Sequence, residues 1–399
     1  MLTPAEATAA IAAHVSPMPA EAVALRECRG RVLREPVHAE RDAPPFDRVA
    51  MDGVAVDHAA VAAGARRLRV AGTQAAGRAP LALDDPRGCI EVMTGAVLPA
   101  GCDAVIPVEE VFREGDEAVL PPALRAERWQ HVHRRGSDAR AGDLLLEAGT
   151  LLRAPEVAIV ASAGLAVVQV TRAPRVAVIS TGDELVEPGL PVLAHQVRRS
   201  NSHALAAALE QVAGAVVEDA HVRDDEDAIA AVISAALDRS DAVVLSGGVS
   251  MGRFDHVPRV LQRLGVRELF HRVAQRPGKP MWFGVAPAGQ PVFGLPGNPV
   301  SVLVCLVRYV LPALSHAVGL PPALPPRVAL AEPVSFRPAL AWFLPVRLEH
   351  DAEGRAWAWP RPTQGSGDFN ALAGTSGFVE LPPGPATFER GTAAPFFGW

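Results

Sequence analysis

From residue 175 onward, apolar segments of strand length alternate with segments that have helical periodicity. RVAVIS, VVEDAHV, DAVVLS and PVFGLP are typical of strands, and segments between them, such as DEDAIAAVISAALDRS, are typical of amphipathic helices. Strands separated by helices of this length connect by right-handed crossovers into a parallel sheet with helices on both faces. We therefore predict a doubly wound α/β domain over residues 174–321, with its ligand at the carboxyl ends of the strands.

Three glycine-rich turns follow strand-like segments between residues 241 and 301, with the sequences SGGVSMGRFD, RPGKP and LPGNPVS. Glycine lets the backbone approach a ligand closely, and the Asn-Pro pair of the third turn is a favourable helix start whose free N–H groups suit an anion. Taken alone, the third turn is explained as well by a capped helix. The residues predicted to bind a phosphorylated or nucleotide-like ligand are Ser246, Gly247, Gly248, Ser250, Gly297, Asn298 and Pro299.

Cations gather at the second of these turns. RPGKP contains Arg276 and Lys279, and Arg272 lies four residues before Arg276. Side chains alternate in an extended segment, so Arg272 and Arg276 are predicted to share one face. The turn at 277–278 brings Lys279 close to them. Three neighbouring cations repel one another unless an anion is bound, so we interpret this turn as anion-binding rather than as a solvated basic loop.

Carboxylates follow the strands at the same edge. Asp224 and Asp225 come after VVEDAHV, and Asp255 ends SGGVSMGRFD. Mg²⁺ takes one or two carboxylates together with phosphate oxygens, so Asp255 and one of the other two are candidate ligands. A carboxylate stabilised by a helix dipole also explains Asp255, and a plain turn also explains STGDEL. STGDEL adds Thr181, Gly182, Asp183 and Glu184.

The bulk composition argues against several classes of function. The 399 residues suffice for two to four domains at roughly 100–200 residues each. A net charge of −6 and a pI near 6.1 argue against nucleic-acid binding. The four scattered cysteines form no CxxC pair and predict reduced thiols in a cytoplasmic protein. We find no apolar leader and no apolar run of the ~18 residues that a membrane span needs, so no membrane association is predicted.

The remaining segments predict three further domains. Residues 1–45, which open with a capped helix, and 141–173 form a linking domain. Short apolar runs separated by turns predict a β-rich insertion domain at 46–140. After the proline-rich linker 321–328, strand-like segments predict a small β domain within 322–399. The fold class is therefore α/β multidomain.

Nine motifs, taken in order along residues 40–380, resemble those of the molybdopterin molybdenumtransferases of the MoeA type, which are similar to the E domain of gephyrin. They are FDRVAMDGVAV, MTGAVLPAGCDAVIPVEE, RRGSDARAGD, PRVAVISTGDELV, VRRSN, DAVVLSGGVSMGRFD, RPGKP, LPGNPVS and TQGSG with GFVELP. By spacing alone, the first three contain polar-tipped β-turns at Asp52, Thr94 and Asp138. The ordered set is far more specific than any single motif.

The resemblance implies a homodimer that inserts molybdate into adenylylated molybdopterin, requires Mg²⁺ and releases AMP. It also implies molybdopterin adenylyltransferase and proteins of molybdoenzyme maturation as partners. By matching position, catalytic roles fall on Glu184, Asp52, Thr94, Asp138 and Asp255, and metal binding on Asp224 and Asp255. Cofactor binding falls on the residues of the turns above and on Arg272, Arg276, Lys279, Pro296 and Ser366.

The chemistry of these side chains agrees with the implied roles. Asp224 and Asp255 would hold Mg²⁺ against a pyrophosphate and neutralise charge that develops at phosphorus. The three cations would clamp the pyrophosphate or the arriving molybdate. Glu184 would manage protons at the dithiolene end as molybdate loses oxygen.

The chain departs from the family pattern at several positions. Val54 stands where the family usually has tyrosine, which removes an aromatic wall or hydroxyl, and Arg272 and Arg276 stand for lysine. Arginine keeps the charge but binds oxyanions bidentately. Ser137 replaces a carboxylate, and Thr-Ser at 375–376 replaces Ala-Asn. The choice between molybdate and tungstate stays open.

Two alternatives use the same residues. An adenylyltransferase that makes the adenylylated intermediate from ATP would need only the sheet domain, whereas here the other domains also match the later-acting family. A non-catalytic scaffold dimer that docks a partner peptide would not need the acidic and basic residues of the site, and those residues are present.

Overall fold

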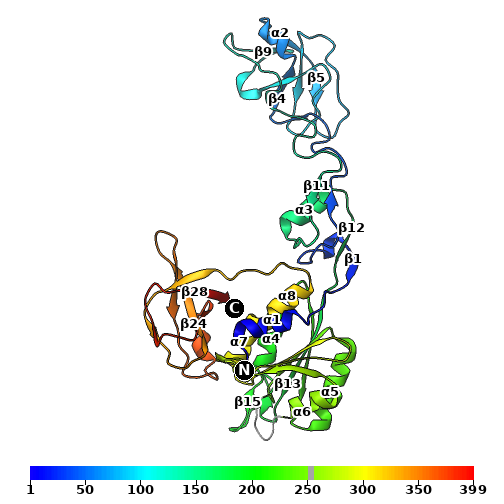
Figure 1. Ribbon diagram of the computed structural model, residues 1–399. Helices are drawn as coiled ribbons and strands as arrows, with labels where there is room; N and C mark the ends of the chain where they lie inside the picture. Colours follow the sequence, from blue (N-terminus) through cyan, green and yellow to red (C-terminus); the bar gives the residue numbers. More distant parts are fainter. Residues whose placement is uncertain (250–255) are drawn as a thin grey trace. The chain divides into compact units, whose positions relative to one another are not determined.

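The computed structural model describes residues 1–249 and 256–399, which divide into two compact units (Figure 1). The main unit comprises Met1–Glu35, Gly149–Ala154 and Val167–Trp399. The insertion unit comprises Pro36–Ala148 and Pro155–Ala166. Each unit has hydrophobic clusters formed by its own residues. Each unit therefore has its own core.

A six-stranded sheet lies at the centre of the main unit, in the order β16-β13-β17-β21-β20-β18. β16, β13, β17 and β21 are parallel, as the doubly wound prediction requires. β20 is antiparallel to both its neighbours, because no crossover helix lies between β18 and β20 or between β20 and β21. The strands are β13 (Arg175–Thr181), β16 (Val216–Val222), β17 (Ala242–Ser246), β18 (Arg267–His271), β20 (Trp282–Val285) and β21 (Pro291–Leu295).

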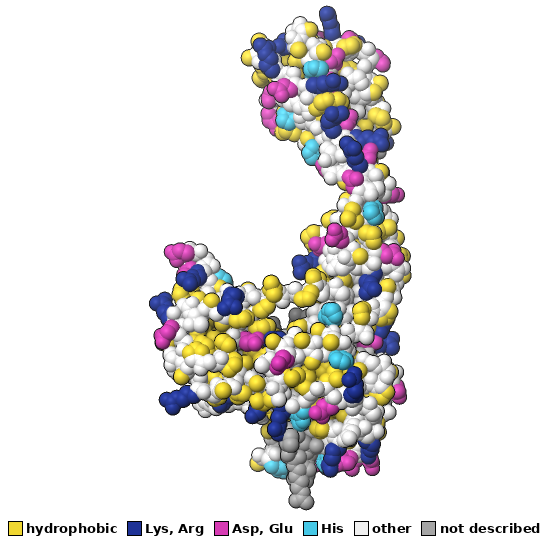
Figure 2. Space-filling view, in the orientation of Figure 1, with side chains coloured by type: hydrophobic (Ala, Val, Ile, Leu, Met, Phe, Trp, Pro, Cys, Tyr) yellow, Lys and Arg dark blue, Asp and Glu magenta, His cyan; other side chains and the backbone are white. Residues whose placement is uncertain are grey.

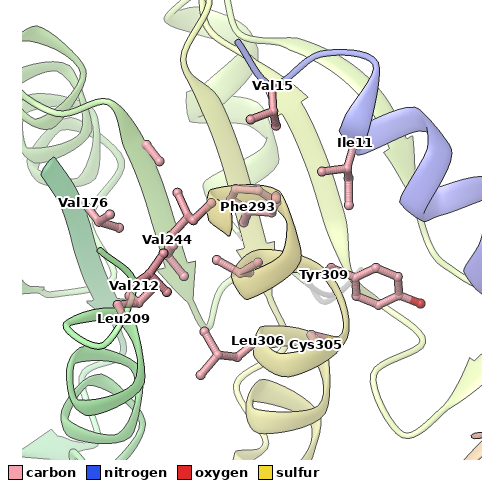
Figure 3. Packing of buried hydrophobic residues seen from close by; sticks show 14 of the residues in the cluster. Ile11, Val15, Val176, Leu209, Val212, Val244, Phe293, Cys305, Leu306 and Tyr309 are labelled. Carbon is pink, nitrogen blue, oxygen red and sulfur yellow. The ribbon is translucent and has the colours of Figure 1, made fainter. Parts of the chain in front are cut away.

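Helices cover both faces of this sheet. Along β13, Val176 and Val178 belong to one apolar cluster, whereas Ala177 and Ile179 belong to the other. Period-two alternation thus buries apolar side chains on both faces, as in sheets covered on both sides. Figure 3 shows part of the first cluster, where strand and helix side chains meet. The helices are α1 (Pro4–Ala12) and α4 (Asn201–Leu209) on the first face, and α5 (Glu226–Arg239) and α6 (Val257–Arg263) on the second.

The helix that follows β21 consists of three segments: α7 (Pro299–Cys305), the π-helical η3 (Leu306–Val310) and α8 (Leu311–Ala317). These 19 residues are long and apolar enough to cross a membrane by length and composition, so the prediction that no run reaches that length is wrong. The most apolar window is 61% buried inside the structure. The helix is apolar because the first cluster covers it on one side and Phe343 and Phe378 contact it on another.

The C-terminal part of the main unit is a sheet that closes on itself. The pairing of β26 with β24 closes the order β24-β25-β22-β28-β26 into a ring. A short strand from the central domain, β19 (Gln275–Arg276), adds to it and places Arg276 opposite Trp342. The ring strands are β22 (Arg327–Leu330), β24 (Ala341–His350), β25 (Ala356–Pro360), β26 (Gly377–Leu381) and β28 (Ala393–Gly398).

Short elements complete the main unit. β1 (Ala20–Ala24) pairs with β12 (Val167–Thr171), which joins the N-terminal segment of the chain to the strand that precedes the sheet domain. The others are η1 (Leu25–Glu27), β14 (Leu185–Val186), β15 (Val197–Arg198), β23 (Val334–Ser335), β27 (Thr387–Phe388) and η4 (Asn370–Leu372).

The insertion unit is mainly β, as predicted, with a sheet in the order β7-β4-β6-β5-β9-β8. Val54 of β4 is buried in an apolar cluster of this sheet. The departure at Val54 therefore stands at a core position of this sheet. The expectation that it removes an aromatic wall or hydroxyl from the site stays a prediction. The elements are β2 (Val37–His38), β3 (Arg48–Val49), β4 (Gly53–Val56), α2 (His58–Ala62), β5 (Arg67–Gln74), β6 (Cys89–Val92), β7 (Ala104–Pro107), η2 (Val108–Glu110), β8 (Phe112–Glu114), β9 (Glu117–Val119), β10 (Val132–His133), β11 (Leu144–Leu146) and α3 (Ala154–Ser162), which starts at the boundary.

Charged side chains of both signs are interspersed on the face of each unit that Figure 2 shows. This agrees with the modest net charge of −6. The prediction that the chain does not bind nucleic acid remains a prediction.

Phe293 is fully buried in β21, and its ring centroid lies 5.0 Å from that of Phe283. Phe293→Ala should lower the free energy of unfolding of the main unit by about 3–5 kcal/mol because it leaves a cavity between sheet and helix. Denaturant unfolding measures the loss. The same substitution at Phe369, which is 38% exposed, should have a much smaller effect. Equal losses would contradict this account of the core.

Candidate functional site

A cavity of about 1250 Å³ lies where β13, β17 and β21 end. Its wall combines the glycine-rich turns, the cationic turn and part of the C-terminal ring. The sequence-predicted residues that line it are Thr181, Gly182, Glu184, Asp224, Ser246, Gly247, Gly248, Arg276, Lys279, Pro296, Gly297, Asn298, Pro299 and Ser366. The structure thus brings together residues of five of these motifs and Asp224, which follows the strand VVEDAHV.

Gly247 and Gly248 occupy a position that tolerates no side chain. Their φ angles are +96° and +65°. A Cβ on Gly247 would lie 2.8 Å from the carbonyl oxygen of Thr181, and one on Gly248 would lie 2.8 Å from its Oγ1. The two glycines therefore let the end of β17 pack directly against the end of β13.

The hydroxyls of Ser180 and Thr181 are buried on the cavity wall, and neither has a hydrogen-bond partner in the part of the chain that the structure describes. Buried polar groups are normally hydrogen-bonded, so unpaired ones call for an explanation such as a ligand. Thr181 was predicted to be a site residue, whereas Ser180 was missed.

Asn201 joins two of the turns and was also missed. Its Nδ2 donates hydrogen bonds to Ser246 Oγ (3.0 Å) and to the carbonyl oxygen of Gly297 (2.8 Å). The preceding Arg199 is buried and forms ion pairs with Asp219 and Glu187. The VRRSN motif was the available signal, since it stands at the start of α4.

The carboxylates take different places around the rim. Glu184 and Asp224 line the cavity, but Asp183 does not. Asp183 accepts hydrogen bonds from Arg223 Nε (3.1 Å) and from the backbone N–H of Asp224 (3.4 Å), and both lower the pKa of its carboxyl group. Asp225 caps α5 by accepting from the backbone N–H of Ala228 (2.8 Å). Of the two candidate metal ligands Asp224 and Asp225, Asp224 is therefore the one that lines the cavity.

The cationic turn differs from the prediction. Arg276 and Lys279 line the cavity, but Arg272 does not. The chain is not extended from 272 to 276: Arg272 has a φ of +81°, and the strand is interrupted before β19. Strand alternation therefore does not apply, and the expectation that Arg272 and Arg276 share a face is wrong.

The start of α7 is capped by the C-terminal domain. Asn298 is the N-cap residue but makes no side-chain capping bond; its Nδ2 donates to Ser366 Oγ instead (2.7 Å). The backbone N–H of Val300 donates to the carbonyl oxygen of Ser366 (3.0 Å). One of the N–H groups predicted to bind an anion is thus already used.

An aromatic wall from the C-terminal ring was missed entirely. Phe336 and Trp342 line the cavity and stack on each other, with ring centroids 4.7 Å apart and ring planes 13° apart. Neither residue belongs to a motif identified in the sequence, because the segment that contains them has a composition common to many strands.

Five predicted residues lie elsewhere. Ser250 and Asp255 fall outside the described residues. Asp52, Thr94 and Asp138 belong to the insertion unit. Thr94 donates to Asp52 Oδ1 from both its hydroxyl and its backbone N–H, each at 2.6 Å, and these bonds lower the pKa of Asp52.

The insertion unit also contains a group of metal-type ligands, Asp57, His58 and Asp103. Local structure accounts for it. Asp57 caps α2, and Asp103 accepts from the backbone N–H (2.9 Å) and Nδ1 (2.7 Å) of His58. Arg128 Nε lies 3.3 Å from the Asp103 carboxylate, where its charge opposes a bound cation.

Three family models match successive parts of the chain. They are the MoeA N-terminal region (domain I and II) at 2–164, the "Probable molybdopterin binding domain" at 177–316 and the MoeA C-terminal region (domain IV) at 327–397. The cavity is lined by residues from the second and third matched ranges. Together, the three matches identify a multidomain α/β protein whose sheet domain matches the model of a probable molybdopterin binding domain.

Individual relatives match over nearly the whole chain. The molybdopterin molybdenumtransferase of Synechocystis sp. is 42% identical over 371 residues, which cover 93% of each chain. That of Synechococcus elongatus is 36% identical over 387 residues, which cover 94% of each chain. A crystal structure of the molybdopterin biosynthesis moea protein from Pyrococcus horikosii superposes with a TM-score of 0.82 at 32% identity and covers all of both chains. The chain belongs to the MoeA family of molybdopterin molybdenumtransferases.

The lowered pKa of Asp183 predicts a specific titration. A carboxyl pKa below its unfolded value stabilises the fold at pH values above the unfolded pKa, and this stabilisation is lost as pH falls through the folded pKa. Arg223→Met should raise the pKa of Asp183 toward that of an unperturbed aspartate, which carboxyl ¹³C NMR can follow. Arg239→Met, which removes the ion pair with Glu218, should leave it unchanged. An unaltered Asp183 titration in Arg223→Met would refute the assigned cause.

Proposed function

We propose that the cavity of the main unit binds adenylylated molybdopterin, accepts molybdate into its dithiolene and releases AMP, with Mg²⁺ required. Family membership makes the chain a transferase of molybdenum cofactor biosynthesis. The observation that supports the cavity as the site is that Arg276 and Lys279 line it without a carboxylate within ion-pair distance among the described residues. Two such cations suit molybdate, a tetrahedral dianion, or a phosphate group.

The described carboxylates fit Mg²⁺. Asp224 offers one carboxylate on the cavity wall, and Mg²⁺ commonly takes one or two carboxylates plus phosphate oxygens and water. Bound there, the ion would neutralise phosphate charge. Asp255 keeps its proposed role as the second ligand.

The chain's own residues divide the remaining work. The turns at Gly247 and Gly297 let the backbone approach the ligand, and Asn201 holds these two turns together. The free hydroxyls of Ser180 and Thr181 are available to the ligand. Glu184, beside Gly182 on the rim, would hold or move the proton when an oxygen leaves molybdate.

Several finer points belong to this proposal. The division into four domains, at 1–45 with 141–173, 46–140, 174–321 and 322–399, is retained. So are the homodimer, the cytoplasmic location and the partner proteins, molybdopterin adenylyltransferase and maturation factors. Asp52, Thr94 and Asp138 keep their proposed catalytic roles.

Purified protein supplied with adenylylated molybdopterin, molybdate and Mg²⁺ should release AMP, measured by chromatography, and omission of molybdate or Mg²⁺ should stop the release. Folded protein that releases no AMP would exclude the proposed reaction. Adenylylation of molybdopterin from ATP would identify the chain as an adenylyltransferase instead. Absence of both activities would favour the scaffold.

Glu184→Gln should lower the rate of cofactor maturation by roughly 100-fold or more, the usual contribution of a positioned acid or base. AMP affinity, measured by calorimetry, should stay close to that of the wild type because the role proposed for Glu184 is at the dithiolene end of the ligand. Glu218→Gln, which alters an exposed ion pair outside the cavity, serves as the control. Parallel loss of maturation and AMP binding in Glu184→Gln would contradict the proton role.

A further inference from the structure

Gln275 is a fully buried polar residue directly before Arg276. Its Oε1 accepts a hydrogen bond from the hydroxyl of Tyr309. Its Nε2 donates to the carbonyl oxygen of Pro277 (3.2 Å) and lies 3.6 Å from Cys305 Sγ. One amide thus contacts the long helix on one side and the cationic turn on the other.

The turn packs directly on this amide. Gly278 has a φ of +89°, and a Cβ there would lie 2.6 Å from Gln275 Nε2 and 2.7 Å from Cys305 Sγ. The Cys305 thiol also donates to the carbonyl oxygen of Gly278 (3.8 Å). The backbone of the turn therefore rests on polar groups of a buried layer, and any displacement of these groups displaces the turn.

The other side of the turn faces the cavity. Arg276 and Lys279 line it, and the strand pairing of β19 with β24 and the bond from the Val273 N–H to the Lys279 carbonyl oxygen (2.9 Å) hold the ends of the turn. Lys279 is the only lysine among the 38 lysine and arginine residues of the sequence. It is therefore a unique chemical reporter of the geometry of the turn.

Tyr309 ties this layer to the helix that begins at the cavity. It lies in the π-helical segment, and Figure 3 shows its ring on the same helix as Cys305, with the hydroxyl directed away from the apolar cluster. π-Helical segments within α-helices are frequently found at functional sites. Pro299, at the start of the same helix, lines the cavity.

We propose that Gln275 is a positioning residue. Together with Tyr309 it holds the turn at 276–279 so that Arg276 and Lys279 meet one tetrahedral oxyanion. The identity of that anion as molybdate rests on the proposed function, whereas the positioning itself does not.

The test measures binding of molybdate and of pyrophosphate, each alone, by calorimetry. Gln275→Met and Tyr309→Phe should each weaken binding about tenfold, the effect expected when a buried hydrogen bond that holds the clamp is lost. The matched control is Gln290→Met, which removes an amide that also donates to a backbone carbonyl (Leu237, 2.8 Å) but lies off the cavity wall. It should bind both anions normally.

Labelling gives a readout that needs no turnover. Pyridoxal 5′-phosphate, an anionic aldehyde, forms an imine with the Lys279 amine, and borohydride reduces it to a stable amine that mass spectrometry locates. Pyrophosphate should block labelling of the wild type. In Gln275→Met, labelling should slow several-fold and pyrophosphate should protect less.

The double variant Gln275→Met with Tyr309→Phe separates positioning from stability. Replacing both partners by apolar groups restores much of the folding stability, because no hydroxyl is left unpaired against methionine. Anion affinity should nevertheless stay low. Affinity that follows the melting temperature across the variants, normal binding by Gln275→Met, or a wild type that binds neither anion would each overturn the proposal. If the wild type shows no catalysis but binds the anions, and Gln275→Met weakens that binding, only the proposed reaction is refuted.

Discussion

Burial of β13, β17 and β21 on both faces is the constraint on which the rest of the structure depends. Side chains that alternate along these strands enter one apolar cluster or the other, so polar chemistry has no place along their length. It is therefore confined to the strand ends, where Gly247 and Gly248 allow β17 to pack against Thr181. The buried hydroxyls of Ser180 and Thr181 mark the point where the core stops and the cavity begins.

The long helix after β21 links this edge to the C-terminal ring. At its start, Ser366 bonds to Asn298 and Val300. Further along, Arg308 donates to Glu380 of the ring (2.8 Å) and to the hydroxyl of Thr8 in α1 (2.8 Å). These partly buried contacts join the ring to the helix and the helix to α1. The same helix thus lines the cavity at its start, with Pro299, and contacts the ring further along.

Features that depend on residues close together in the sequence were predicted correctly. The capping box of Thr3 and Glu6 is present, with both reciprocal bonds formed, and the parallel strands were located by their composition. Contacts between residues far apart in the sequence were not predicted. Asn201 bonds to groups 45 and 96 residues away, and Trp342 meets the cavity only because β24 pairs with β19. Arg272 was misplaced because a positive φ in a non-glycine residue leaves no signal in the composition.

The two cations on the cavity wall are chemically unlike, and the layer beneath them gives that difference a function. A guanidinium binds an oxyanion along an edge through two parallel N–H bonds, whereas an ammonium acts as a compact point charge. Arg276 is held by strand pairing with Trp342, and Lys279 stands beyond a turn that rests on Gln275 and Cys305. The backbone at Arg276 is thus paired with the ring, and the backbone just before Lys279 packs on a residue of the long helix, Cys305. An anion that contacts both Arg276 and Lys279 therefore requires the ring and the helix to keep their relative positions. The C-terminal ring is thus part of the binding site and not merely an attached domain.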